Sequence, residues 1–277
     1  MTACGSVFYK MSGSGNDFVV FDGRHQRPAD WPPEEIAAVC DRRQGVGADG
    51  LVILTPAGPG RVRMDYWNCD GSPADMCGNA ALCSTRLAVH LGLVPGPELV
   101  LETAAGAFLA RCRPGPGEEA ELNLPDFAVP ETPPGLEAGP AESNPRVAVV
   151  GVPHLVLEVT DLERSDLMAR GRTLRRDPAL GPAGANVNFV APANGPDSDW
   201  CLRTYERGVE AETLACGTGA VASAVALAVS GRATLPVRIR TRSGRPLHIT
   251  ATVSDGYARN VWLAGEGRLV FRGVLQG

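Results

Sequence analysis

The sequence contains a single lysine, Lys10, against 25 arginines. Enzymes that use pyridoxal phosphate hold it as a Schiff base on a lysine side chain, and Lys10 stands in a strand-like stretch near the start of the chain. The scarcity of lysine therefore argues against pyridoxal-phosphate chemistry, which depends on an aldimine with lysine.

Other absences exclude further classes of protein. No apolar run reaches the ~18 residues that cross a bilayer, and the first ten residues lack the basic start and apolar core of a secretory signal. The eight cysteines include no Cys-x-x-Cys pair, so zinc-site spacing is absent and no metal is expected. The net charge of −5 argues against nucleic-acid binding. We expect a cytoplasmic protein with reduced thiols and with neither a membrane nor a nucleic acid as partner.

One helix pattern occurs twice. Residues 77–92 read CGNAALCSTRLAVHLG, and residues 216–231 read CGTGAVASAVALAVSG. Both begin with Cys-Gly, continue through alanine-rich residues of good helix propensity, and reach a glycine fifteen positions after the cysteine. The two cysteines lie 139 residues apart, half of the 277-residue chain. We interpret the pattern as an internal repeat.

Weaker parallels occur in the same order. The offset of the cysteines also aligns Tyr66 with Tyr205, residues 45–54 resemble 181–190 in outline, and 16–22 resemble 151–159. A stretch rich in proline and glycine, 124–145, separates the halves. We predict domains at 1–125 and 126–265, with 266–277 forming a C-terminal strand that packs back on the N-terminal half.

Strand-like segments outnumber helical ones. The predicted fold class is α/β, of the α+β kind, with two pseudo-symmetric halves. Each half is a strongly curved, barrel-like, mostly antiparallel sheet around a central helix, and the active site lies in the cleft between the halves.

A cysteine at a helix start suits proton transfer. Unsatisfied amides and the positive end of the helix dipole stabilise a thiolate there. A glycine nearby, such as Gly219, leaves room for an anion to reach the amides. If two such ends hold one α-carboxylate, one thiolate removes the α-proton and the opposite thiol delivers another. Cys77 and Cys216 therefore indicate a cofactor-independent racemase or epimerase, whereas the other six cysteines read as structural.

Six stretches together resemble the motif series of the diaminopimelate epimerase family: KMSGSGNDFVVFD, RRQGVGADGLVIL, NCDGSPADMCGNAALC, GVPH, ANVNFV and YERGVEAETLACGTGA. They span residues 10 to about 222 in the order of the family. The resemblance implies two pseudo-symmetric halves, homodimerisation, and interconversion of LL- and meso-diaminopimelate without pyridoxal phosphate, on the route to lysine and peptidoglycan precursors.

The resemblance also implies residue roles. Cys77 and Cys216 are the expected acid/base pair, and His154 is expected to orient or polarise a thiol. The remaining positions are expected to bind substrate. The reacting carboxylate is held by the backbone amides of Gly78, Asn79, Gly217 and Thr218, and the reacting ammonium donates to Glu206. The distal amino-acid head is bound by Arg207, Asn16, Asn68 and Asn186. Asp17, Asp49 and Asp70 are interpreted as residues that brace loops. The chain departs from many members at Val152, where they have asparagine.

Three alternatives remain open on the residues alone. A racemase of the same fold could act on another amino acid, which substrate competition would reveal. A hydrolase or transferase could use one cysteine as nucleophile with His154, and would form a covalent acyl-enzyme. A non-enzymatic anion-binding protein would need the amides but not the thiols, and would keep its ligand when both cysteines are replaced by serine.

Overall fold

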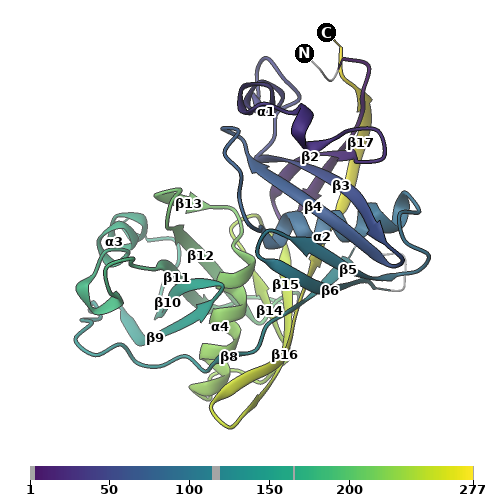
Figure 1. Ribbon diagram of the computed structural model, residues 1–277. Coiled ribbons are helices and arrows are strands. Elements are labelled where there is room, and N and C mark those ends of the chain that lie inside the picture. The colour runs from purple at the N-terminus through teal and green to yellow at the C-terminus, as the bar shows by residue number, and fades with distance from the viewer. Residues whose placement is uncertain (1–3, 114–118, 165, 277) are drawn as a thin grey trace. The chain divides into compact units, whose positions relative to one another are not determined.

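The computed structural model describes residues 4–113, 119–164 and 166–276. The chain divides into two units, one made of residues Met1–Asn123 and Ala264–Gly277 and the other of Leu124–Leu263. Strands predominate in both units, and the helices are few (Figure 1). The predicted mixed, sheet-dominated fold class is therefore confirmed. Among the described residues, no helix is long and apolar enough to cross a membrane.

Unit 1 alternates antiparallel and parallel pairing along its sheet. β1 pairs antiparallel with β2, β2 parallel with β3, β3 antiparallel with β4, β4 parallel with β5, and β5–β6 and β6–β7 are antiparallel. The C-terminal strand β17 pairs antiparallel with β1. The strands are β1 (Val7–Gly13), β2 (Asn16–Asp22), β3 (Gly50–Gly58), β4 (Arg61–Asn68), β5 (Glu98–Thr103), β6 (Gly106–Cys112), β7 (Glu119–Leu124) and β17 (Arg268–Val274).

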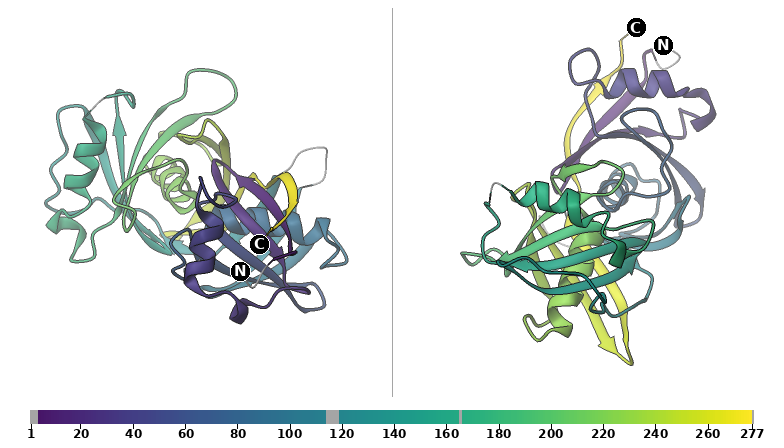
Figure 2. Two further views of the ribbon diagram at one scale, coloured as in Figure 1. Left: turned by 90° about the horizontal axis from the view of Figure 1, so that it is seen from above. Right: turned by 90° about the vertical axis from the view of Figure 1, so that its left-hand side faces the viewer.

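The strands of unit 1 surround one helix, α2 (Gly78–His90). It packs against β1 to β6 and against β17, and the right-hand view of Figure 2 looks along it with strands curving around it. Its alanine, serine and threonine side chains are small and buried, so the sheet can approach closely on several sides. The shorter helix α1 (Pro33–Cys40) follows a 3₁₀ turn (Pro28–Asp30) and covers a separate cluster that includes Phe21, Ile36 and Leu51.

Unit 2 repeats this pairing order. β9 pairs antiparallel with β10, β10 parallel with β11, β11 antiparallel with β12, β12 parallel with β14, and β14 antiparallel with β15. The strands are β8 (Phe127–Ala128), β9 (Glu142–Val150), β10 (Val152–Val159), β11 (Asn186–Pro192), β12 (Trp200–Glu206), β13 (Ala211–Thr213), β14 (Val237–Arg240), β15 (Pro246–Ser254) and β16 (Tyr257–Glu266), the last of which ends within unit 1. The repeat seen in the sequence is thus a repeat of topology.

The helices occupy matching places in the two orders. α4 (Gly217–Val229) follows β12 and β13 and precedes β14, as α2 follows β4 and precedes β5. It packs against β9, β10, β11, β14 and β15 and is apolar on all sides, as a helix inside a core should be. α3 (Leu167–Leu174) and the 3₁₀ turn Pro178–Leu180 lie between β10 and β11, where α1 lies between β2 and β3.

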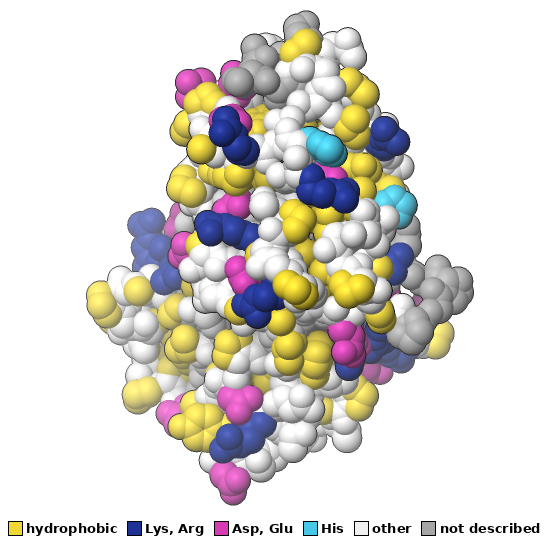
Figure 3. All heavy atoms as spheres, turned by 45° about the vertical axis from the view of Figure 1, so that its right-hand side comes forward, with side chains coloured by type: hydrophobic (Ala, Val, Ile, Leu, Met, Phe, Trp, Pro, Cys, Tyr) yellow, Lys and Arg dark blue, Asp and Glu magenta, His cyan; other side chains and the backbone are white. Residues whose placement is uncertain are grey.

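Charged side chains are mixed on the surface. On the face drawn in Figure 3, the Lys and Arg side chains are scattered among acidic and apolar ones and do not gather into one patch.

Candidate active site

The two cysteine-headed helices begin with the same backbone geometry. Cys77 is extended (φ −134°, ψ 123°) and so is Cys216 (φ −128°, ψ 106°), and the helix starts at the next residue in each copy. Neither cysteine caps its helix through the side chain. The first intrahelical bonds run from Ala81 to Cys77 and from Ala220 to Cys216. Three amides in each copy therefore precede the helical ladder and suit an anion.

The cysteines differ in their surroundings. The Cys77 side chain is partly exposed, and Cys216 is 7% exposed. Among the other cysteines, burial raises the pKa of Cys40 to about 12 and raises that of Cys83, inside α2, well above its usual value. Such thiols stay protonated and inert at neutral pH. No disulfide joins any of the eight cysteines, all of which the structure describes.

In unit 1 two candidate asparagines contact each other. The Asn79 Nδ2 donates to the Asn16 Oδ1 at 2.7 Å, and the Asn16 Nδ2 donates to the Asp49 Oδ2 at 2.8 Å. Because the carboxylate can only accept, this chain determines which way both amides point. It leaves the Asn79 Oδ1 buried and without a hydrogen-bond partner among the described residues. A buried acceptor in that state favours a ligand that can donate to it.

A cluster of charged side chains fixes Asp49, the residue whose carboxylate accepts from the Asn16 side chain. Arg42 donates to Asp17 at 2.8 Å and to Asp49 at 2.6 Å, and Lys10 lies 2.6 Å from Asp17. Burial opposes the ionisation of Asp17, but the hydrogen bonds from Arg42 and Lys10 outweigh it, so the Asp17 pKa is lowered. The only lysine is 8% exposed and also donates to the Gly47 carbonyl, which gives it a structural role in this cluster.

Asn68 ends β4 and enters a turn. Its Nδ2 donates to the Ser72 hydroxyl at 3.1 Å, and its Oδ1 accepts from the Tyr66 hydroxyl at 3.2 Å. The amide of the next residue, Cys69, donates to the Asp49 carbonyl at 3.0 Å. Asp49 therefore ties the Asn68 turn to the Asn16 side chain.

In unit 2 strand register brings further candidates together. His154 on β10 lies opposite Asn186 on β11 in the parallel ladder. The Asn186 Oδ1 accepts from the Arg207 backbone amide at 2.8 Å, at the end of β12 where Glu206 precedes it. Burial raises the pKa of the Glu206 carboxyl. A cation such as a substrate ammonium would favour its ionised form.

His154 is fully buried and contacts the start of α4. Its Nε2 lies 3.1 Å from the Thr218 hydroxyl, which lies 3.7 Å from the Cys216 sulfur. Burial, with the positive charge of Arg207, lowers the pKa of His154 to about 3, and a hydrogen bond between the ring and the Val150 backbone offsets this only in part. The ring is therefore neutral at physiological pH and cannot act there as a proton donor in the imidazolium form.

Sequence reasoning missed two residues of this neighbourhood, Asn188 and Thr204. Asn188 is fully buried and hydrogen-bonds with His154 and Thr204. A signal was present, because an asparagine alternates with apolar residues inside a strand-like run, NVNFV, where a buried amide needs partners. Its partners could not be read from the sequence.

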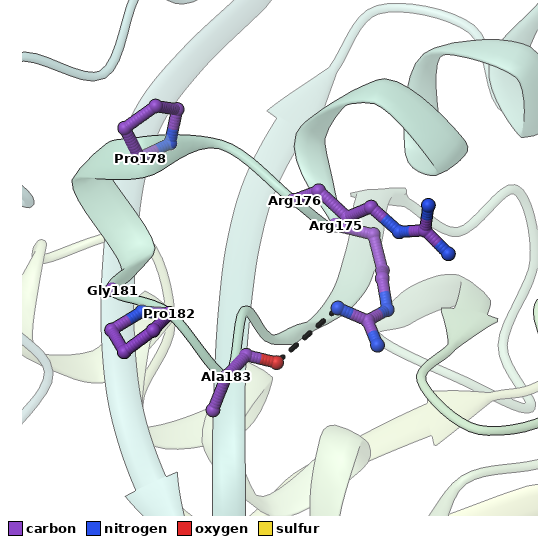
Figure 4. A pocket seen from close by; sticks show the side chains of 6 residues that line it. All are labelled: Arg175, Arg176, Pro178, Gly181, Pro182 and Ala183. Atoms are coloured by element: carbon purple, nitrogen blue, oxygen red, sulfur yellow. Dashed lines mark hydrogen bonds between the residues drawn. The ribbon is translucent and has the colours of Figure 1, made fainter.

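A surface hollow of about 540 Å³ lies elsewhere in unit 2, against Pro178, Gly181 and Pro182 (Figure 4). Arg175 on its wall bonds to the Ala183 carbonyl and to Glu210. None of the candidate residues lines it. Within the described part of the chain, no group of three or more His, Cys, Asp or Glu side chains is arranged to bind a metal.

Solved structures resemble the whole chain in fold. A phenazine biosynthesis protein of the PhzF family from Bacillus anthracis matches with a TM-score of 0.73 at 15% identity, covering 98% of this chain and 99% of that one. A hydroxyproline epimerase from Agrobacterium vitis matches with a TM-score of 0.66 at 19% identity, covering 98% and 90%. At these identities the likeness concerns the fold.

Sequence relatives are much nearer. The diaminopimelate epimerase of Gemmatimonas aurantiaca is 45% identical over 288 residues, covering 98% of this chain and 99% of that protein. The diaminopimelate epimerase of Aquifex aeolicus is 38% identical and covers 97% of each. A family model described as diaminopimelate epimerase matches residues 8–117 and 146–260. Because these matches run along most of its length and include both cysteine-headed helices, this chain belongs to the diaminopimelate epimerase family.

Proposed function

We propose that this protein is an isomerase that interconverts LL-2,6-diaminopimelate and meso-diaminopimelate without pyridoxal phosphate, in the synthesis of lysine and peptidoglycan precursors. The observation that carries the proposal is the duplicated helix start. Cys77 and Cys216 occupy the same position, with the same extended backbone, before two helices that follow matching strands. A single-base or nucleophilic reaction would need one such cysteine, whereas inversion by two bases needs both.

The proposed reaction moves one proton off the α-carbon and another onto it. One cysteine, as thiolate, takes the α-proton, and the electron pair of the broken C–H bond moves into the adjacent carboxylate. The other cysteine, as thiol, gives its proton to the opposite face of the same carbon. The centre is inverted and the two sulfurs exchange protonation states, so the reverse reaction needs no further proton donor.

The helix starts supply the stabilisation that this reaction requires. The amides of Gly78 and Asn79 in one copy, and of Gly217 and Thr218 in the other, are suited to hold the carboxylate on which negative charge develops. Glu206 accepts from the reacting ammonium. Arg207 offers its guanidinium to the distal carboxylate, with the amides of Asn16, Asn68 and Asn186 at the same distal head.

The proposal extends to the molecule as a whole. We propose that the protein is located in the cytoplasm and forms a homodimer. We also propose domains at residues 1–125, 126–265 and 266–277. Pairing of β17 with β1 supports the last boundary. No reductant, oxidant or cofactor enters the proposed reaction.

Proton exchange tests this function directly. Purified protein is incubated under reducing conditions in D₂O, without added cofactor, with LL- or meso-diaminopimelate, and followed by NMR and chiral chromatography. Deuterium at the α-carbon together with interconversion of the isomers is the expected result. Absence of exchange with either isomer, in protein shown to be folded, would reject diaminopimelate as substrate, and proline or hydroxyproline would be tried next.

A further inference from the structure

Asn188 lies at the centre of a buried hydrogen-bond network in unit 2. Its Nδ2 donates to the Leu155 carbonyl at 3.0 Å and lies 3.2 Å from the Nδ1 of His154, and its Oδ1 accepts from the Thr204 hydroxyl at 2.9 Å. Both Asn188 and His154 are fully buried. They lie on the neighbouring strands β10 and β11, beside α4 (Figure 1).

The contacts determine how the amide is oriented. Reversing the nitrogen and oxygen of Asn188 would place its Oδ1 against the Leu155 carbonyl oxygen, two acceptors with no hydrogen between them. The nitrogen must therefore face both Leu155 and His154. One hydrogen of the amide nitrogen goes to the Leu155 carbonyl, and the other is directed to the Nδ1 of His154 at 3.2 Å, which is nearer than the Asn186 carbonyl at 3.5 Å. Since an amide nitrogen can only donate, the Nδ1 of His154 accepts and carries no proton.

The tautomer of His154 follows from this. A neutral imidazole with a bare Nδ1 carries its proton on Nε2. That Nε2–H points to the Thr218 hydroxyl oxygen at 3.1 Å. Because the hydroxyl oxygen then accepts from the ring, its own hydrogen is available to the Cys216 sulfur at 3.7 Å. A thiolate has no hydrogen to donate, so the Thr218 hydroxyl must be the donor when the Cys216 sulfur is ionised.

The packing of α4 keeps these atoms together. A Cβ at Gly219 would overlap the Asn188 Oδ1 and come within 3.1 Å of the Cys216 sulfur. The absent side chain at Gly219 is therefore what allows Asn188 to sit against the start of the helix.

We propose that Asn188 is a positioning residue that holds His154 in its neutral Nε2–H tautomer, so that His154 orients the Thr218 hydroxyl to donate to the Cys216 thiolate. The thiolate state of Cys216 in this network rests on the proposed role of Cys216 in proton transfer. The network favours the charged state of the sulfur without placing a charged histidine beside it. Arg207, whose positive charge reaches the ring, further disfavours an imidazolium there.

The first test needs no substitution in the network. Protein labelled with ¹⁵N-histidine is examined by long-range ¹H–¹⁵N NMR between pH 6 and pH 8, and His154 is identified among the four histidines by the signal lost in His154→Gln. The expected spectrum shows a protonated Nε2 and a bare Nδ1 that do not titrate. A proton on Nδ1, or titration of the ring in this range, would overturn the proposal.

The second test measures the thiol. The pKa of Cys216 is followed by NMR of ¹³Cβ-labelled cysteine, assigned with Cys216→Ser. Thr218→Val removes the hydroxyl at nearly constant shape and should raise the pKa of Cys216 by about one unit, a tenfold smaller thiolate fraction at a pH below both values. Thr218→Ser should restore the original value. An unchanged pKa in folded Thr218→Val would refute the hydroxyl-to-sulfur bond.

A matched pair tests Asn188 itself. Asn188→Leu removes the donor to His154, so it should release the tautomer and raise the pKa of Cys216. Thr204→Val removes the hydroxyl that donates to the Asn188 Oδ1. It should change neither the tautomer of His154 nor the pKa of Cys216. If Asn188→Leu fails to fold, the tautomer of His154 in the unsubstituted protein remains the test, and a proton on its Nδ1 refutes the proposal. None of these readouts depends on turnover, so a protein inactive toward diaminopimelate would reject the proposed function and still answer this question.

Discussion

At the residue scale, the proposed proton-transfer groups and the proposed carboxylate-binding groups are separate parts of each helix start. The thiols of Cys77 and Cys216 stand one residue before the first helical amides, so truncating a side chain leaves the backbone donors in place. Whether a group can serve in the reaction then depends on its protonation state, which burial and neighbouring charges determine.

Replacing either cysteine by alanine should therefore strongly reduce turnover while sparing binding. We expect Cys77→Ala and Cys216→Ala each to lower kcat for interconversion by about 10²–10⁴-fold, the usual contribution of one acid/base group, with a small change in KM. Steady-state kinetics on both isomers measures this. Cys4→Ala, at an exposed cysteine, is the control. A single variant that keeps wild-type turnover would rule out the two-base mechanism.

Glu206 illustrates a conflict between stability and function. Burial raises the pKa of its carboxyl in the folded protein, so at pH values between the unfolded and the folded pKa the folded state holds a proton that the unfolded chain has lost. Stability from this group is fully present below the unfolded pKa, about 4.3, and is lost as the pH rises through the folded pKa. Glu206→Gln should accordingly raise Tm at pH 7 but not at pH 4. It should also raise KM, because the reacting ammonium would lose the acceptor proposed for it.

Thermal unfolding at the two pH values checks the first part, and kinetics the second. Glu163→Gln is the control, because that carboxyl is 73% exposed and should change neither quantity. Equal stabilisation by Glu206→Gln at pH 4 and pH 7 would contradict the account.

At the scale of elements, the helices depend on glycines for two different reasons. Gly92 and Gly231, which follow α2 and α4, have left-handed φ of +64° and +68°, as a helix C-terminus favours. Gly219 lies inside α4 and has no such φ. It is required by packing, because Asn188 occupies the space of a Cβ.

Gly219→Ala should therefore destabilise the protein although alanine is the better helix former. Intrinsic propensity favours alanine by about 1 kcal/mol, but the overlap with Asn188 and the Cys216 sulfur should reverse the sign and lower the free energy of unfolding by about 1–3 kcal/mol. Urea denaturation measures it. Gly96→Ala, where a Cβ meets nothing within 4 Å, should be close to neutral. A stabilised Gly219→Ala would show that the overlap relaxes at no penalty.

At the scale of the whole molecule, the proposed reaction needs both cysteines at one carbon. We expect mild oxidation of the substrate-free protein to join Cys77 to Cys216, with loss of activity that reductant reverses. Mass spectrometry of peptides under non-reducing conditions identifies the bond, and Cys216→Ser should prevent it. Irreversible inactivation, or the absence of a Cys77–Cys216 peptide, would count against two thiols that share one substrate atom.

Features that depend on local pattern could be predicted from the amino-acid sequence. The two Cys-Gly helix starts, their equal length and the closing glycines could be read because helix propensity and termination are properties of neighbouring residues. The internal repeat could be read because the same patterns recur in the same order. The strand-like segments, including those now seen as β14, β15 and β17, followed from short alternating runs.

Which polar groups contact one another depends on how the strands and helices pack. Asn79 contacts Asn16 across 63 positions, and His154 contacts Thr218 across 64 and Asn188 across 34. Such contacts set the orientation of each amide, the neutral state of His154 and the need for Gly219. No local pattern encodes them, because a hydrogen bond and the desolvation that strengthens it depend on distances that exist only after the strands and helices have packed.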